Sequence, residues 1–142
     1  MPNPKTYWLT IIIVGLAFIG FADATFLTVE HFTNSSVPCF ITTGCDTVTT
    51  SSYSTLGPIP VALLGALYYL AMLIFALLYL DLKKLIFRRL MFWFAFLALA
   101  DSLYFFYLQA FVLHAYCIYC LISAVVALLI FLCTLGARFY RV

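Results

Sequence analysis

Residues 117–135 read CIYCLISAVVALLIFLCTL and contain no charged side chain. A helix that crosses a membrane needs about 20 mainly apolar residues, so this stretch predicts a span that opens on a Cys-x-x-Cys motif. The composition of the whole chain agrees, because 67% of its 142 residues are hydrophobic and only 8% are charged. Such a composition is typical of an integral membrane protein, and it excludes an ordinary soluble domain or a nucleic-acid-binding protein.

Three further apolar segments have the length of a span, so the sequence predicts an all-α, polytopic membrane four-helix bundle. The predicted spans cover about residues 8–31, 59–80, 90–113 and 117–135. They leave room for a single domain, residues 1–142, and for one outer loop at 33–58 that is rich in Ser and Thr. Asp46 or Thr47 can N-cap a short helix there, and we expect this loop to cap the bundle on its extracytoplasmic side.

The basic residues predict the orientation, because lysine and arginine accumulate on the cytoplasmic side of membrane proteins. All seven lie before the first span, between the second and third, or after the fourth: Lys5, Lys83, Lys84, Arg88, Arg89, Arg138 and Arg141. The loop at 33–58 and the link at 114–116 contain none. We therefore expect both termini in the cytoplasm and the cysteine pairs in an oxidising compartment. The expected location is the inner membrane of a cell, with the endoplasmic reticulum membrane as the alternative.

Two acidic residues, Asp23 and Asp101, fall inside predicted spans. A carboxylate at the centre of a bilayer costs roughly 3 kcal/mol on insertion scales, and the many apolar residues of each span outweigh that cost. Intramembrane acids usually face the interior of a bundle and have a role. The plainer alternative is that both are protonated and hydrogen-bonded to a hydroxyl group.

Four of the five cysteines form two pairs on the expected outer side. Cys117 and Cys120 share a helix face, with Cys117 at the helix N-terminus, where the dipole favours a thiolate. Cys120 lies one turn deeper, by about 4–5 Å. Cys39 and Cys45 lie six residues apart in the outer loop, where they can exchange with an external thiol and then reach Cys117.

Structural disulfides and a zinc site are the alternatives for these four cysteines. The tight ring of a Cys-x-x-Cys disulfide is easily reduced, so it is less often purely structural. Cysteine pairs divided between a loop and a membrane helix are poorly placed to bind one zinc ion. We therefore expect redox chemistry and no metal. The fifth cysteine, Cys133, lies near the cytoplasmic end of the last span, and we expect it to be an inert packing residue.

The order of these features resembles the vitamin K epoxide reductase family in its bacterial branch, over nearly the whole chain. The resemblance is carried by Cys39…Cys45-Asp46-Thr47-Val48, Ser51-Ser52-Tyr53, Gly57-Pro58-Ile59-Pro60 leading into Leu67-Tyr68-Tyr69, Leu103-Tyr104 with Gln109, and Cys117-Ile118-Tyr119-Cys120. A loop pair followed by a late Cys-x-x-Cys on four spans is quite specific. The unrelated four-span quinone-linked disulfide generator of bacteria carries its Cys-x-x-Cys in the first outer loop instead.

The resemblance implies a four-helix bundle with a quinone at its centre and a role for each cysteine. It implies that Cys120 contacts the quinone ring and that Cys117 is its disulfide partner. It further implies that Cys45 attacks Cys117 and that Cys39 exchanges with a thioredoxin-like protein. Ser51 matches a serine near the active site and is a further candidate for a quinone contact. Many relatives carry a fused thioredoxin-like domain, so here we expect the partner to be a separate protein.

We therefore expect a membrane enzyme that oxidises a thioredoxin-like dithiol, reduces a ubiquinone- or menaquinone-class quinone and supports disulfide formation. Reduction of vitamin K or its epoxide is the alternative within the family. Ser123 and Ala124 replace the first two residues of the vertebrate Thr-Tyr-Ala motif, whose tyrosine helps to bind vitamin K, and this argues against that alternative. The alternatives from other classes are a membrane adaptor and a small proton-coupled multidrug transporter using Asp23 or Glu30, in which paired cysteines have no part.

Overall fold

The computed structural model describes residues 4–33, 55–56, 59–112 and 118–139. The elements are α1 (Pro4–Thr33), β1 (Thr55–Leu56), β2 (Ile59–Pro60), α3 (Val61–Leu82), α4 (Leu85–Tyr107), the π-helix η2 (Leu108–Val112) and α5 (Ile118–Phe139). β1 and β2 form an antiparallel pair with Thr55 opposite Pro60. Apart from this short pair, the described part of the chain is helical, which confirms the predicted all-α bundle. The short helix predicted in the outer loop lies outside the described residues.

Four helices are long and apolar enough to cross a membrane, as predicted: Pro4–Glu30, Val61–Leu82, Leu85–Val112 and Ile118–Arg138. The first and third begin earlier than expected, because Lys5 and Arg89 lie within helices and not in the flanking segments. Long basic side chains permit this, since their apolar stems stay with the helix while the charge reaches the polar surface.

The connection between α3 and α4 is shorter than the predicted break at 81–89 and consists of Lys83 and Lys84. Lys83 has a φ of 56°, in the left-handed region. Its backbone N–H donates to the carbonyl oxygen of Tyr79 at 2.9 Å, which closes the left-handed cap common at helix ends. The chain reverses at this cap, so α3 and α4 are antiparallel neighbours.

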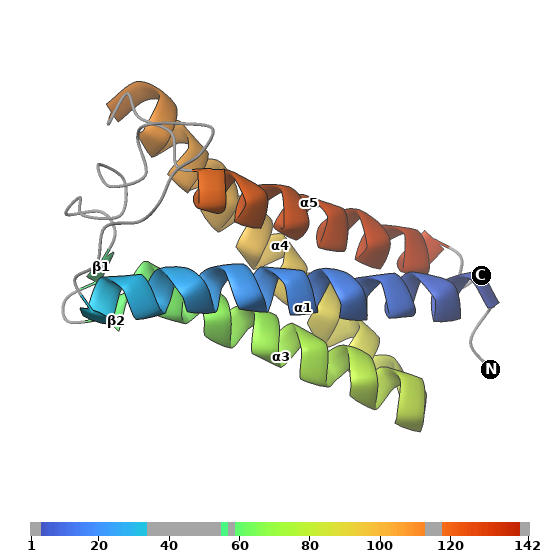
Figure 1. Cartoon of the computed structure of the whole chain (residues 1–142). Coiled ribbons are helices and arrows are strands. Elements are labelled where there is room, and N and C mark those ends of the chain that lie inside the picture. The colour runs from blue at the N-terminus through green and yellow to red at the C-terminus, as the bar shows by residue number, and fades with distance from the viewer. Residues whose placement is uncertain (1–3, 34–54, 57–58, 113–117, 140–142) are drawn as a thin grey trace.

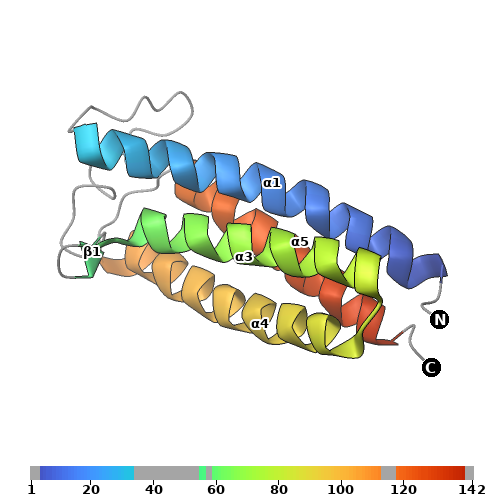
Figure 2. The ribbon, with the colours of Figure 1, turned by 90° about the horizontal axis from the view of Figure 1, so that it is seen from below.

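The two ends of the bundle differ in chemistry. The start of α1, the α3–α4 turn and the end of α5 lie together at one end (Figure 1), and the view from below shows the same arrangement (Figure 2). We call it the basic end, because its described residues include Lys5, Lys83, Lys84, Arg88, Arg89 and Arg138. We call the opposite end, where α1 finishes and α5 begins, the cysteine end, because it contains Cys120.

The packed core extends from the basic end through the middle of the bundle. Its fully buried residues come from all four long helices and include Ile13, Ala17, Met72, Ala76, Ala95 and Ile130. Close packing of this kind holds helices together in a membrane, where lipid tails are as apolar as the side chains. Two aromatic pairs extend the contact: Phe75 and Phe94 join α3 to α4 at 5.3 Å between ring centroids, and Phe96 and Phe131 join α4 to α5 at 6.3 Å.

α4 leaves this core in its second half. Its buried residues before that point are Arg88, Met91 and Ala95. No residue of the following stretch, Phe96–Tyr107, is buried, and in Figure 1 this part of α4 stands clear of α1 and α3. We call this stretch the outer segment of α4. Burial resumes at Leu108 and Gln109 in η2, so the outer segment is an unburied stretch between two groups of buried residues.

Candidate functional site

Cys120 is the one predicted cysteine of the redox pairs that lies in the described part of the chain. It occupies the first turn of α5 and is half-buried. Cys39, Cys45, Cys117 and Ser51 lie outside the described residues, so their predicted roles stay predictions. Cys133 is half-buried and packs against the hydrophobic core, as expected for a packing residue.

On one side, Cys120 is bordered by the last turns of α1. The ring of Phe26 lies 5.1 Å from the ring of Tyr119, measured between centroids. Farther along the same two helices, a Cβ atom added at Gly136 would lie 3.4 Å from Cδ1 of Leu9. Both contacts fit the same antiparallel register of α1 against α5. The first turn of α5 is therefore held against α1 at the cysteine end.

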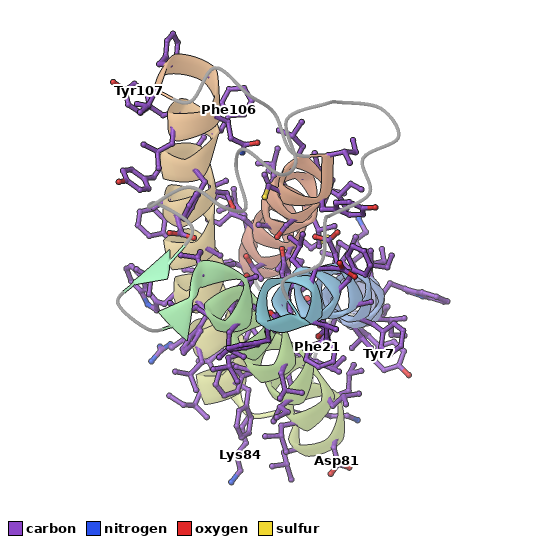
Figure 3. The ribbon with its side chains drawn as sticks, turned by 60° about the vertical axis from the view of Figure 1, so that its left-hand side comes forward. Tyr7, Phe21, Asp81, Lys84, Phe106 and Tyr107 are labelled. Atoms are coloured by element: carbon purple, nitrogen blue, oxygen red, sulfur yellow. The ribbon has the colours of Figure 1, made fainter. Side chains whose placement is uncertain are left out.

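The outer segment of α4 ends at about the same level along the bundle as Cys120. Antiparallel helices advance equally, by 1.5 Å per residue, so the pairing of Phe96 with Phe131 places Tyr107 about level with Cys120. Figure 3 shows Tyr107 at the end of α4 that lies far from Lys84. Residues 118–125 of α5, like the outer segment of α4, include no buried residue. The bundle is therefore loosely packed beside Cys120.

Ser123, one turn deeper than Cys120 on α5, is tied to α3 by a hydrogen bond. The hydroxyl group of Tyr69 donates to the carbonyl oxygen of Ser123 at 2.8 Å and lies 2.9 Å from Ser123 Oγ. The Ser123 hydroxyl can donate to the Tyr69 oxygen at the same time, because a hydroxyl both donates and accepts. Tyr69 is only 2% exposed. This bond fixes the depth of the first turns of α5, and with it the depth of Cys120.

Gly20 on α1 makes room for the Tyr69 ring. A Cβ atom at Gly20 would lie 2.6 Å from Cδ1 and Cζ of that ring, which is closer than atoms of packed side chains approach. One turn away, a Cβ atom at Gly65 would lie 3.7 Å from Cβ of Ala24. These small residues let α1 and α3 approach closely, so Tyr69 can extend past α1 and reach α5.

Three buried polar atoms of the cysteine-end half have no hydrogen-bond partner within the described residues: Asp23 Oδ2, Thr25 Oγ1 and Tyr68 Oη. Asp23 also lies close enough to Tyr69 for an electrostatic interaction. Buried polar atoms are normally paired, so unpaired atoms in the same half of the bundle as Cys120 are typical of a place where a polar ligand binds. Asp23 Oδ2 therefore does not make the hydrogen bond to a hydroxyl group that was the plainer alternative for Asp23 and Asp101.

Asp101 differs from the prediction that intramembrane acids face the bundle interior. It is exposed on the outer segment of α4, in which no residue is buried. Its exposure belongs to the same loosely packed region as Cys120.

Sequence reasoning assigned no function to Tyr69 and passed over Gly20. The available signal was a pair of small residues at helical spacing, Gly20 and Ala24, which matches the small residues near Gly65 on α3. That spacing indicates close helix contact, but it does not show which side chain crosses the contact.

The chain matches a known protein family. The model of the vitamin K epoxide reductase family matches residues 11–135, most of the chain. The matched range contains the predicted cysteine pairs, Gly20, Tyr69 and Ser123. No curated protein matches the chain significantly.

Proposed function

Because the chain belongs to the vitamin K epoxide reductase family, whose members are membrane oxidoreductases that act with quinones, we propose that it couples thiol oxidation to quinone reduction. Electrons would leave a separate thioredoxin-like protein, enter at Cys39 and Cys45 and pass to Cys117 and Cys120. They would then reduce a quinone of the ubiquinone or menaquinone class. The reaction would support disulfide formation in exported proteins.

The observation that carries the proposal is the position of Cys120. It lies in the first turn of α5, half-buried, and about level with the end of the outer segment of α4, where no residue is buried. Ligand sites are mostly apolar with a few polar groups that fix orientation, and this region has that character. The unpaired polar atoms nearby fit a ligand with polar ring substituents, as a quinone is. Ser51, in the outer loop, is the further candidate for a quinone contact.

The proposed reaction balances in electrons and protons. The thiols of Cys117 and Cys120 form a disulfide and release two electrons and two protons, and a quinone takes up both to become a quinol. A thiolate of the Cys39–Cys45 pair then attacks that disulfide, which restores the inner dithiol and oxidises the outer pair. The thioredoxin-like dithiol finally reduces the outer pair, so one dithiol is oxidised for each quinone reduced.

The proposed orientation places the basic end in the cytoplasm. Lysine and arginine accumulate on that side of a membrane, and the described basic residues lie together at the basic end. The cysteine pairs would then face an oxidising compartment, where disulfides persist. The membrane would be the inner membrane of a cell or the endoplasmic reticulum membrane.

The test is turnover of the purified protein with a reduced thioredoxin-like protein and ubiquinone-1 or menadione. Replacing Cys120 or Cys117 by Ala should lower turnover by roughly a thousandfold or more, since residues that act as one reacting unit cannot substitute for each other. Cys133→Ala is the matched control, because it removes a thiol from the same helix near the basic end, and it should retain turnover. Turnover that survives Cys120→Ala contradicts the proposal.

Reduction of vitamin K epoxide, the reaction that names the family, is a second candidate. Ala124 offers no phenol, and Ser123 is already bonded to Tyr69, so α5 supplies no tyrosine at the position of the vertebrate motif. Supplying the epoxide and measuring quinone formation separates the two reactions.

A further inference from the structure

We propose that the hydroxyl group of Tyr68 donates the hydrogen bond that holds one ring oxygen of the quinone. The inference rests on the proposed function and adds to it the protein group that orients the quinone ring beside Cys120. Tyr68 would thus supply from α3 the phenol that α5 lacks at Ala124.

The position of Tyr68 on α3 directs it toward the loosely packed region. Phe75 contacts Phe94 of α4 at 5.3 Å between ring centroids. Tyr68 lies seven residues before Phe75, two helical turns away, and therefore on the same face of α3. Since α3 and α4 are antiparallel, Tyr68 is about level with Asp101, in the outer segment of α4.

The Tyr68 side chain also leans toward the cysteine end. Side chains on a helix tilt toward its N-terminus, and the N-terminus of α3 lies at the cysteine end. The hydroxyl group is therefore displaced from the level of Asp101 toward that of Cys120. This is the region in which neither the outer segment of α4 nor residues 118–125 of α5 contain a buried residue.

The ring of Tyr68 rests on a fixed neighbour. It meets the ring of Tyr69 edge to face, with centroids 4.9 Å apart. Tyr69 in turn is held by its hydrogen bond to Ser123 on α5 and by the space at Gly20 on α1. Three helices thus position the ring against which Tyr68 packs. A donor held in this way can orient a ligand without a large loss of side-chain freedom.

The hydrogen-bonding capacity of Tyr68 matches a quinone. Its oxygen is buried and has no hydrogen-bond partner within the described residues. A buried hydroxyl without a partner is costly, and that cost is removed when an acceptor arrives. The ring oxygens of a quinone are carbonyl acceptors, and a phenol is a donor. A carboxylate at the same place would repel the growing negative charge of the reduced ring.

Because the Tyr68 oxygen is buried, the quinone must displace a neighbouring element to reach it. The outer segment of α4 is the element that can move, since none of its residues is buried. α4 stays attached through its buried residues Arg88, Met91 and Ala95.

The experiment compares quinone binding to the wild-type protein and to Tyr68→Phe, which removes one oxygen atom. The probe is ubiquinone-1, added to the purified full-length protein in detergent. We expect the dissociation constant to rise about tenfold, the value of one hydrogen bond to a buried acceptor. We also expect the infrared carbonyl band of bound, isotope-labelled quinone to shift upward, because one carbonyl loses its donor.

A second measurement separates a binding role from a structural one. Without quinone, Tyr68→Phe should unfold at the same temperature as the wild type or higher, because the variant no longer buries an unpaired hydroxyl. Tyr69→Phe should instead unfold at a lower temperature, because it loses the bond to Ser123. Tyr79→Phe, a buried tyrosine of α3 near the basic end, is the matched control and should bind ubiquinone-1 as the wild type does.

An affinity change below about threefold in Tyr68→Phe overturns the inference, since it is less than one hydrogen bond is worth. A lower unfolding temperature of the quinone-free variant also overturns it, because Tyr68 would then be structural. These outcomes differ from a failure of the proposed function, in which the wild type itself would not reduce ubiquinone-1 and loss of Cys120 would change nothing.

Discussion

The basic end and the cysteine end of the bundle are built from similarly apolar helices but are packed differently. The core that extends from the basic end contains Met72, Ala76 and Ile130 with no exposed surface. At the cysteine end, α4 buries nothing along its outer segment, and polar atoms of Asp23 and Tyr68 lack partners within the described residues. The half near the basic end therefore stabilises the bundle by close packing. The half near the cysteine end instead contains unpaired polar groups that are available to a ligand.

This division has a thermodynamic reason. Each buried hydroxyl or carboxyl without a partner lowers stability by about 1–3 kcal/mol, which a well-packed bundle can tolerate only if packing elsewhere offsets it. Functional sites commonly carry such costs. One tight contact in this half is that of Tyr69 with Gly20, and the Tyr69 bond to Ser123 fixes the depth of Cys120.

The largest effect on stability should come from breaking that contact with Gly20→Ala. The new methyl group would displace the Tyr69 ring, so we expect a loss of about 2–4 kcal/mol, from overpacking together with loss of the bond to Ser123. Reversible unfolding in mixed detergent measures it. Gly15→Ala is the control, because an added Cβ meets nothing within 4 Å, and it should be neutral or stabilising. Equal effects of the two substitutions would contradict a tight contact of Tyr69 at Gly20.

A smaller effect is expected from cavities, and it tests the comparison of the two ends directly. Met72→Ala should lower the free energy of unfolding by about 2 kcal/mol, at the low end of the values for buried residues of soluble proteins. In a membrane protein such a substitution removes packing contacts, but it changes the free energy of transfer from water little. Leu103→Ala, on the outer segment of α4, should cost less than about 0.5 kcal/mol, since Leu103 is 62% exposed. The same unfolding assay applies, and similar costs at both positions would contradict a loosely packed outer segment.

The smallest effect is a gain, at the turn of the basic end. Lys83 has a φ of 56°, which costs a residue with a Cβ atom roughly 1 kcal/mol relative to glycine. Lys83→Gly should therefore raise stability by about 0.5–1 kcal/mol. Lys84, with a φ of −88°, is the matched control that loses the same charge. Its replacement by glycine should give no gain, and a gain there as large as at Lys83 would point to charge and not to backbone conformation.

The sequence was sufficient to predict the four helices and the gathering of basic residues at one end. These features depend on local properties: the length of apolar runs and the position of charges. The starts of α1 at Pro4 and of α4 at Leu85 were missed, because a basic residue near the membrane surface, such as Lys5 or Arg89, can belong to a helix or to the segment beside it.

The two halves of α4 could not be told apart from the sequence. Both halves are mainly apolar and each contains a few polar residues, Arg88 and Arg89 in the first and Asp101 and Ser102 in the second. The pattern of polar and apolar residues therefore does not separate the segment that packs from the one that does not. The hydrogen bond between Tyr69 and Ser123 could not be predicted from the sequence either, because it depends on the space that Gly20, which has no Cβ atom, leaves on a third helix. The roles of Cys39, Cys45 and Cys117 stay predictions, since these residues lie outside the described part of the chain.

The attachment of α4 through Arg88, Met91 and Ala95 has a consequence for how a substrate arrives. A helix held at these residues can move outward beyond them without detaching from the bundle. A quinone dissolved among lipid tails would then enter sideways, directly from the bilayer. The quantity that saturates the enzyme would be the mole fraction of quinone in the lipid, so diluting proteoliposomes with buffer would leave the rate per enzyme unchanged, whereas diluting them by fusion with quinone-free lipid would lower it.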